Sequence, residues 1–129
     1  MVYECPPKVF GICDEENYLH RFRVVIEFDR DVWKLRIIYL EEGTVECSFK
    51  YQLYDFDDRT NEKFLVMEGN VFYKNMTSYF RAEGQNRPKR FNEIQLNLKM
   101  TIPCRNSVSL PMYIEQNYLK LVQKLDEIQ

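Results

Sequence analysis

The sequence predicts a mainly β protein, an antiparallel β-sandwich followed by one C-terminal α-helix. Two long segments, residues 44–54 and 92–102, alternate apolar and polar residues with a period of two. Side chains on a strand point to opposite faces in turn, so each segment has one buried and one wet face. Strands of covered parallel sheets read as continuous apolar runs instead. After Cys104 the apolar residues recur at steps of three and four, as they do along one face of a helix.

The apolar faces of the two long segments are the predicted core. In the first segment they consist of Val45, Cys47, Phe49, Tyr51 and Leu53. In the second they consist of Ile94, Leu96, Leu98, Met100 and Ile102. The chain also contains nine Phe and nine Tyr residues. Aromatic side chains pack well on pleated surfaces, so this content favours an all-β body.

Before residue 20 we expect irregular chain apart from one short edge strand, formed by Val9, Phe10 and Ile12. Two consecutive prolines exclude a helix just before it. Residues 20–28 and 32–41 then alternate again, and a short polar turn joins them into a predicted hairpin. Gly43 can take positive φ in the following turn, which leads into the strand at 44–54.

Two polar loops and one interrupted strand complete the predicted sandwich. Residues 55–61 are interpreted as the solvated acidic tip of a hairpin. Residues 62–73 are predicted to be a strand that is bulged or broken at Gly69 and Asn70. Residues 74–90 are predicted to be a polar loop that carries a small basic patch, with Lys74, Arg81, Arg87, Lys89 and Arg90.

Residues 111–129 are predicted to form an amphipathic helix that follows a sandwich of residues 1–110. Its apolar stripe consists of Ile114, Tyr118, Leu121, Val122, Leu125 and Ile128. Pro111 suits the first turn and Ser109 a capping position. A helix of about eighteen residues is marginal alone, so something must cover the stripe. The cover is either the helix's own sandwich or another chain, and the sequence leaves both open.

The run of residues 20–53 resembles the substrate-binding domain of seven-in-absentia-type proteins. The matching elements are Phe22 with Glu27, Trp33, Gly43, and Phe49, Tyr51 and Leu53. The segment LNLKMTIPC at 96–104 is similar to the closing strand of that domain. The resemblance implies a TRAF-like antiparallel β-sandwich, related to the MATH domain. That family carries a RING and zinc fingers before the domain; this chain has no closely spaced Cys/His set, so ubiquitin-ligase activity is not implied.

The sequence shows no catalytic, metal or cofactor motif. It has one His and no Cys–His or Ser–His arrangement or Gly-rich phosphate loop, so we assign no catalytic residue. Cys5, Cys13 and His20 match no common zinc spacing, and we expect no metal and no cofactor. No apolar run approaches the ~20 residues that cross a bilayer. We expect no membrane association and an intracellular protein, cytoplasmic or nuclear.

These observations favour a non-catalytic protein-interaction module, an adaptor or a complex subunit. It would bind a partner peptide or chain through a sheet edge, a groove or the C-terminal helix. The candidate partner-binding residues are Val9, Phe10, Ile12, Ile114, Tyr118, Leu121, Val122 and Leu125. The resemblance also allows a homodimer. The alternative is single-stranded nucleic-acid binding through aromatic residues and the basic loop at 81–90, against which the formal charge of −2 argues.

Overall fold

The computed structural model describes residues 2–5, 7–14, 16–86, 90–91, 93–102, 106–110 and 122–123. These residues form ten β-strands and no α-helix, which confirms the mainly β prediction for the described part of the chain. The strands are β1 (Val2–Glu4), β2 (Lys8–Cys13), β3 (Leu19–Asp29), β4 (Val32–Tyr39), β5 (Val45–Phe56), β6 (Lys63–Met76), β7 (Tyr79–Asn86), β8 (Glu93–Ile102), β9 (Asn106–Leu110) and β10 (Val122–Gln123). Within the same residues, no helix has the length and apolar character needed to cross a membrane.

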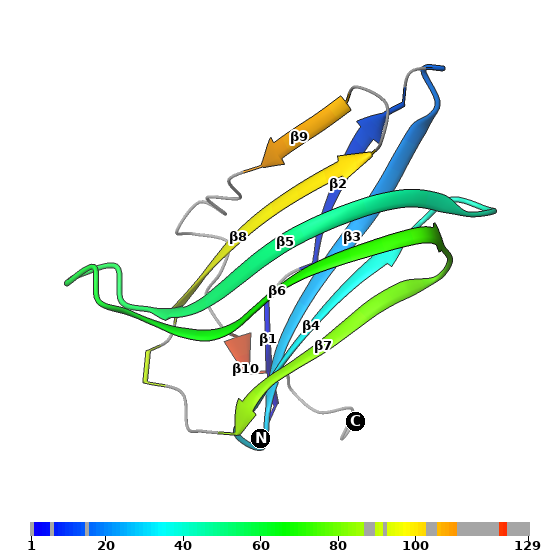
Figure 1. Ribbon diagram of the computed structural model, residues 1–129. Helices are drawn as coiled ribbons and strands as arrows, with labels where there is room; N and C mark the ends of the chain where they lie inside the picture. Colours follow the sequence, from blue (N-terminus) through cyan, green and yellow to red (C-terminus); the bar gives the residue numbers. More distant parts are fainter. Residues whose placement is uncertain are drawn as a thin grey trace.

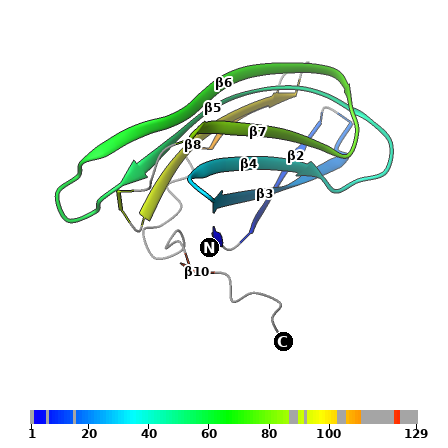
Figure 2. The same cartoon turned by 90° about the horizontal axis from the view of Figure 1, so that it is seen from below.

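The strands form two antiparallel sheets that pack face to face (Figures 1 and 2). The first sheet has the order β10-β1-β3-β4-β7, and β2 also pairs with β3. The second has the order β6-β5-β8-β9. One cluster of buried apolar side chains lies between them, with Trp33 and Leu35 from the first sheet and Phe49, Leu53 and Leu96 from the second. The predicted inward faces of the two long segments are therefore confirmed.

The predicted hairpin around residue 30 is confirmed as β3 and β4. Asp29 pairs directly with Val32, which leaves a two-residue turn. Both turn residues have positive φ, 51° at Arg30 and 64° at Asp31. This conformation matches the right-handed twist of the flanking strands, but non-glycine residues adopt it only at a cost. Gly43 also has positive φ, 89°, as its turn position predicts.

The predicted interruption at Gly69 and Asn70 is wrong. β6 is continuous, and these two residues pair in register with Tyr51 and Lys50 of β5. The register of this ladder shifts elsewhere, at Val66 and toward Met76. Glycine at 69 therefore does not mark a break in the strand; it leaves room for the Tyr51 ring, as the contacts at this position show.

The expected loop at 74–90 contains β7, a strand at the side of the first sheet. Phe80 is 7% exposed and belongs to the core, and Ala82 packs against it on the same face. Tyr79, Arg81 and Glu83 alternate with them and are exposed. The prediction failed because only Phe80 and Ala82 occupy apolar inward positions, and two residues, one of them small, are too few to show a period of two. Residues 87–89 of the basic patch lie outside the described residues.

The prediction for Asp55 is also wrong, because this residue is not part of the hairpin tip. It lies inside β5 and is 2% exposed. The tip begins at Asp57, whose backbone N–H donates to the carbonyl of Glu62 at 2.9 Å. The sequence misled here because aspartate is rarely buried unless it is paired, so an aspartate next to other acidic residues is normally interpreted as part of a loop.

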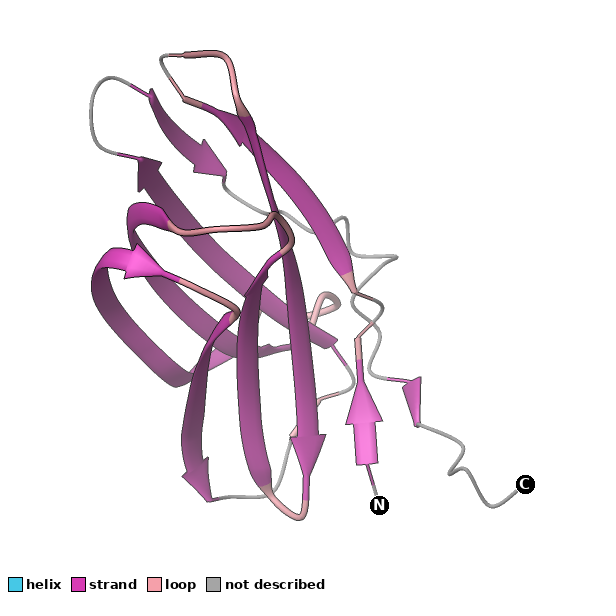
Figure 3. Cartoon of the chain, turned by 90° about the vertical axis from the view of Figure 1, so that its right-hand side faces the viewer, coloured by secondary structure: helices cyan, strands magenta, loops and turns pink. Residues whose placement is uncertain are grey.

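Most of the predicted C-terminal helix, with Ile114, Tyr118, Leu121 and Leu125, lies outside the described residues. Val122 and Gln123 are described, and they form β10 instead of a helical turn. β10 pairs with β1 at the side of the first sheet (Figure 3). Ser109, the expected helix cap, lies in β9.

Candidate functional site

Strand β2 has an open edge in the described structure. Its only strand partner among the described residues is β3. The backbone carbonyl of Ile26 accepts a bond from Cys5 on this side of β3, whereas that of Arg21 accepts from Leu40 on the β4 side. Backbone groups alternate between the two sides of a strand, so the even residues of β3 face β2.

That alternation decides which backbone groups of β2 are directed to the open edge. Phe10 and Ile12 lie opposite the even residues Phe22 and His20, so they bond to β3. The N–H and C=O groups of Val9 and Gly11 therefore point away from β3, toward the open edge. We call these two residues the β2 edge.

Exposed apolar side chains lie beside the β2 edge. Val9 is 49% exposed and Leu19, at the start of β3, is 51% exposed. A Cβ atom placed on Gly11 would come within 2.7 Å of the Leu19 side chain, so Leu19 lies over Gly11. Tyr18, in the connecting loop, is 65% exposed. The sequence did not single out Tyr18 or Leu19, although two large apolar residues directly after a polar turn were a readable signal.

The predicted partner-binding residues of β2 have different environments. Val9 is at the surface. Phe10 is half-buried and its ring stacks on Phe22 at 5.4 Å between centroids. Ile12 is 2% exposed and belongs to the core, so its side chain cannot reach a partner of the folded domain. Of the C-terminal candidates, the structure describes the backbone of Val122 alone, opposite Glu4 of β1.

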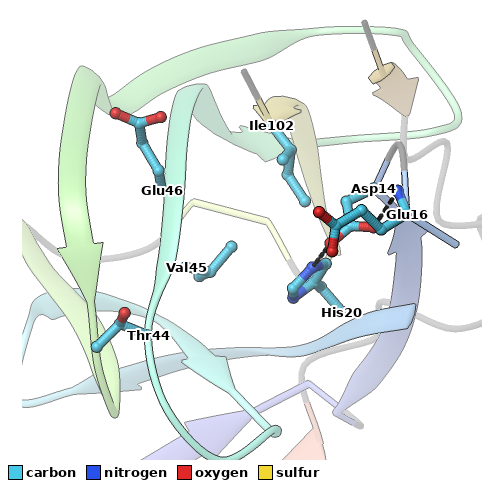
Figure 4. A pocket seen from close by; sticks show the side chains of 7 residues that line it. All are labelled: Asp14, Glu16, His20, Thr44, Val45, Glu46 and Ile102. Carbon is cyan, nitrogen blue, oxygen red and sulfur yellow. Dashed lines mark hydrogen bonds and ion pairs between the residues drawn. The ribbon is translucent and has the colours of Figure 1, made fainter. Parts of the chain in front are cut away.

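A hydrogen-bond chain links the β2–β3 loop to strand β4 through His20. Figure 4 shows its first part, between Asp14 and His20. One Asp14 carboxylate oxygen accepts the backbone N–H groups of Glu16 and Tyr18, at 2.9 and 3.0 Å. The other is 2.8 Å from His20 Nε2, and His20 Nδ1 is 2.7 Å from the Tyr39 hydroxyl. The bond from His20 holds the pKa of Asp14 below its usual value. Burial raises the pKa of Tyr39, which keeps its hydroxyl neutral.

This arrangement has little scope for acid–base catalysis. Both ring nitrogens of His20 are engaged, so neither is available to a substrate without breaking a bond. A pocket of about 270 Å³ lies beside it and is lined by Asp14, Glu16, His20, Thr44, Val45, Glu46 and Ile102 (Figure 4). Within the residues that the structure describes, no group of three or more His, Cys, Asp or Glu side chains could hold a metal ion. The Asp14–His20–Tyr39 chain links the β2–β3 loop to β4.

The described cysteines are in two kinds of environment. Cys5 and Cys47 are buried in the core, and the Cys47 thiol donates to the sulfur of Met76 at 3.7 Å. Burial raises the pKa of Cys5 to about 12 and that of Cys47 to about 11. A thiol must lose its proton to act as a nucleophile, so these two are unreactive at neutral pH. Cys13 is exposed on β2.

The basic residues proposed for nucleic-acid contact are engaged where they are described. Arg81 pairs with Glu83 at 2.9 Å, and the Arg90 guanidinium lies over the Phe64 ring at 4.3 Å. Most aromatic rings point into the core, and only Tyr18, Phe72 and Tyr79 stand out as exposed among the described residues. These contacts do not add support to the nucleic-acid alternative.

A second pocket, of about 440 Å³, lies where the side of the second sheet meets that of the first. It is lined by Tyr51, Leu65, Val66, Met67, Glu68, Glu83 and Gly84. A Cβ atom on Gly84 would come within 2.8 Å of the Val66 carbonyl oxygen. Glycine at 84 therefore lets β7 approach β6 closely at this point. We call this the seam pocket.

Comparison with protein-family models, curated proteins and solved structures gives no match to the chain.

Proposed function

We propose that this protein is a non-catalytic protein-interaction module that binds an extended segment of a partner protein along the β2 edge. The observation that carries the proposal is the side of β2 that pairs with no described strand, where the backbone groups of Val9 and Gly11 are directed outward. An exposed strand edge is a template for one more strand. Strand addition of this kind is a common mode of peptide recognition, in which main-chain bonds give affinity.

The surface beside the edge supplies a basis for selectivity. Val9 and Leu19 lie exposed on the outer face of the β2–β3 hairpin, and Tyr18 is nearby in the connecting loop. Side chains of an added strand alternate between the two faces of the sheet. Alternate apolar residues of the partner would therefore pack on Val9 and Leu19. The Asp14–His20–Tyr39 chain holds the adjacent loop in place, so the loop loses less conformational entropy when a partner binds.

We include in this proposal the relationship that the sequence suggested, a divergent TRAF-like domain. The antiparallel two-sheet architecture supports it, and so does the burial of Phe22, Trp33 and Phe49, three of the residues that carry the resemblance. Those positions support the fold and do not identify a ligand.

A proline substitution tests the role of the open edge. Val9→Pro removes the N–H group that points outward, while the bonds of Lys8 and Phe10 to β3 remain; proline is tolerated at such edge positions. Val9→Thr is the matched control, since it keeps the N–H group and the β-branched shape. Both variants are used as baits for affinity capture with quantitative mass spectrometry, after thermal melts confirm that they fold.

The expected result is a partner set retained by the wild type and by Val9→Thr and lost with Val9→Pro. An added-strand complex should also show slowed amide hydrogen exchange at Val9 and Gly11 when a captured partner is bound. Retention of every partner by folded Val9→Pro would exclude binding along this edge.

A further inference from the structure

The seam pocket contains a polar group that has no partner among the described residues. Tyr51 is 6% exposed and lines the pocket. Its hydroxyl makes no hydrogen bond with any residue that the structure describes, although its ring contacts Phe80. Burial raises the pKa of Tyr51, so the hydroxyl stays neutral at physiological pH and can both donate and accept. The hydroxyl is not among the fully enclosed polar atoms that lack a partner, so it is open to the pocket and can bond a ligand or water there.

The walls and the rim of the seam pocket differ in character. Leu65, Val66 and Met67 contribute apolar surface from β6. Glu83 is on the rim, but its carboxylate is paired with Arg81. Glu68 is also on the rim, exposed, and makes no ion pair with a described residue. The pocket therefore presents one uncompensated carboxylate next to apolar walls.

We propose that the seam pocket binds an arginine side chain of an extended protein segment. The methylene stem packs against Val66 and Met67. The guanidinium lies at the β6 edge, between the Tyr51 hydroxyl on the inner face of the sheet and the Glu68 carboxylate on its outer face. Arginine fits better than lysine because its planar group carries five N–H donors, so one side chain serves both oxygens. It is also less strongly hydrated than an ammonium, which lowers the cost of entering a partly closed site.

The backbone of such a segment has a place to lie. β7 pairs with β4 alone among the described strands, so its other side, which carries Glu83 and Gly84, faces the pocket. The inference shares with the proposed function the premise that the domain binds protein segments. It concerns the opposite side of the first sheet from the β2 edge, so each site can fail without the other.

The test uses terminally blocked pentapeptides of the sequence Thr-Val-Arg-Val-Thr and three relatives with citrulline, lysine or glutamate at the centre. Citrulline keeps the shape of arginine and removes its charge. Binding to the isotope-labelled full chain is followed by chemical-shift titration up to millimolar peptide. We expect arginine to bind about tenfold more tightly than citrulline, the ratio for a charge-assisted bond, and lysine to fall between them.

Variants then assign the contacts. Tyr51→Phe removes only a hydroxyl that has no partner among the described residues, so it should fold normally and weaken arginine binding about fivefold. Glu68→Gln should weaken it about tenfold and remove most of its salt dependence. Glu46→Gln, at the pocket beside His20, is the matched control and should bind as the wild type does.

Equal affinity for the arginine and citrulline peptides, or no shift at any pocket residue at millimolar peptide, would overturn the inference. Unchanged binding by both Tyr51→Phe and Glu68→Gln would do the same. Val9→Pro distinguishes the two proposals: it should leave the arginine peptide bound while it removes partners of the β2 edge. Loss of edge partners without arginine binding leaves the proposed function standing and removes only this inference.

Discussion

The ring of Tyr51 lies directly over Gly69 on the neighbouring strand. The two residues are cross-strand partners, and a Cβ atom at 69 would overlap the Tyr51 ring and hydroxyl. Aromatic side chains cover glycines in sheets in this way, because the glycine leaves space and the ring shields its backbone. The pair also carries the Tyr51 hydroxyl to the β6 side of the sandwich, where it lines the seam pocket. A packing relationship in the core thus positions a candidate binding group.

Gly69→Ala should lower the free energy of unfolding by about 1–3 kcal/mol, the usual cost of overpacking. Urea denaturation measures it. Gly11→Ala is the matched control, because a Cβ there meets mainly the end of the flexible Leu19 side chain, and it should cost clearly less. In a Tyr51→Leu background the Gly69→Ala penalty should shrink, since the ring is gone. Equal losses at both glycines would show that Tyr51 does not occupy the space above Gly69.

The long strands could be predicted because their inward positions are filled by large apolar residues. Phe49 and Leu53 on β5 and Leu96 on β8 are all at most 1% exposed. The period of two also identified the inward faces of β3 and β4. β7 was missed because Phe80 is its one large inward residue among those described, and a single residue has no period.

The candidate sites were less predictable, since they depend on pairs far apart in the chain. Glu68 and Gly84 meet at the seam pocket only because β6 and β7 lie in different sheets. Similarly, the sequence predicted that Val9 lies in an edge strand. Which side of β2 stays unpaired, however, depends on the order of the strands in the sheet, which no local pattern gives. His20 was visible as the one histidine, yet its link to Tyr39 is a cross-strand contact that no local pattern reveals.

One substitution in the turn between β3 and β4 should make the protein more stable. Asp31 is held at φ 64°, a left-handed conformation that costs most residues about 1 kcal/mol and glycine almost nothing. Asp31→Gly should therefore raise the free energy of unfolding by about 0.5–1 kcal/mol, measured by urea denaturation. Asp58→Gly, in the β5–β6 turn where positive φ is not required, should lower stability or leave it unchanged. A loss at Asp31→Gly would mean that its side chain stabilises the turn.

Asp14 should make stability depend on acid pH. Its folded-state pKa is lowered, chiefly by the bond from His20, whereas unfolded Asp has a pKa of about 3.9. Between these two values the unfolded state binds more protons, so stability rises with pH and falls as pH drops through that window. The stability advantage of wild type over Asp14→Asn should therefore be full at about pH 5 and shrink toward about pH 2. A constant difference over that range, by urea denaturation, would contradict a lowered pKa.

Asp55 is the only buried charged residue among those that the structure describes, and it fixes the chain just before β8. Its two carboxylate oxygens accept the backbone N–H groups of Arg90 and Phe91, at 2.6 and 3.1 Å. Both neighbours then pack on Phe64: the Arg90 guanidinium lies over its ring, and the Phe91 ring stacks on it at 6.0 Å. A single carboxylate thus orders the entry to a strand, through a bond to a residue 35 positions further along the chain.

Asp55→Ala should lower the free energy of unfolding by about 3 kcal/mol, because it removes two charge-assisted bonds and leaves two backbone donors without their acceptor. Asp55→Asn keeps one acceptor oxygen, so its loss should be smaller. Asp58→Ala is the matched control; no hydrogen bond or ion pair ties its side chain to a described residue, and its effect should stay within about 0.5 kcal/mol. Urea denaturation measures all three, and amide exchange at Arg90 and Phe91 should speed up in Asp55→Ala. If Asp55→Ala were as stable as Asp58→Ala, solvent would have to reach both amides, and the buried carboxylate would not hold this segment.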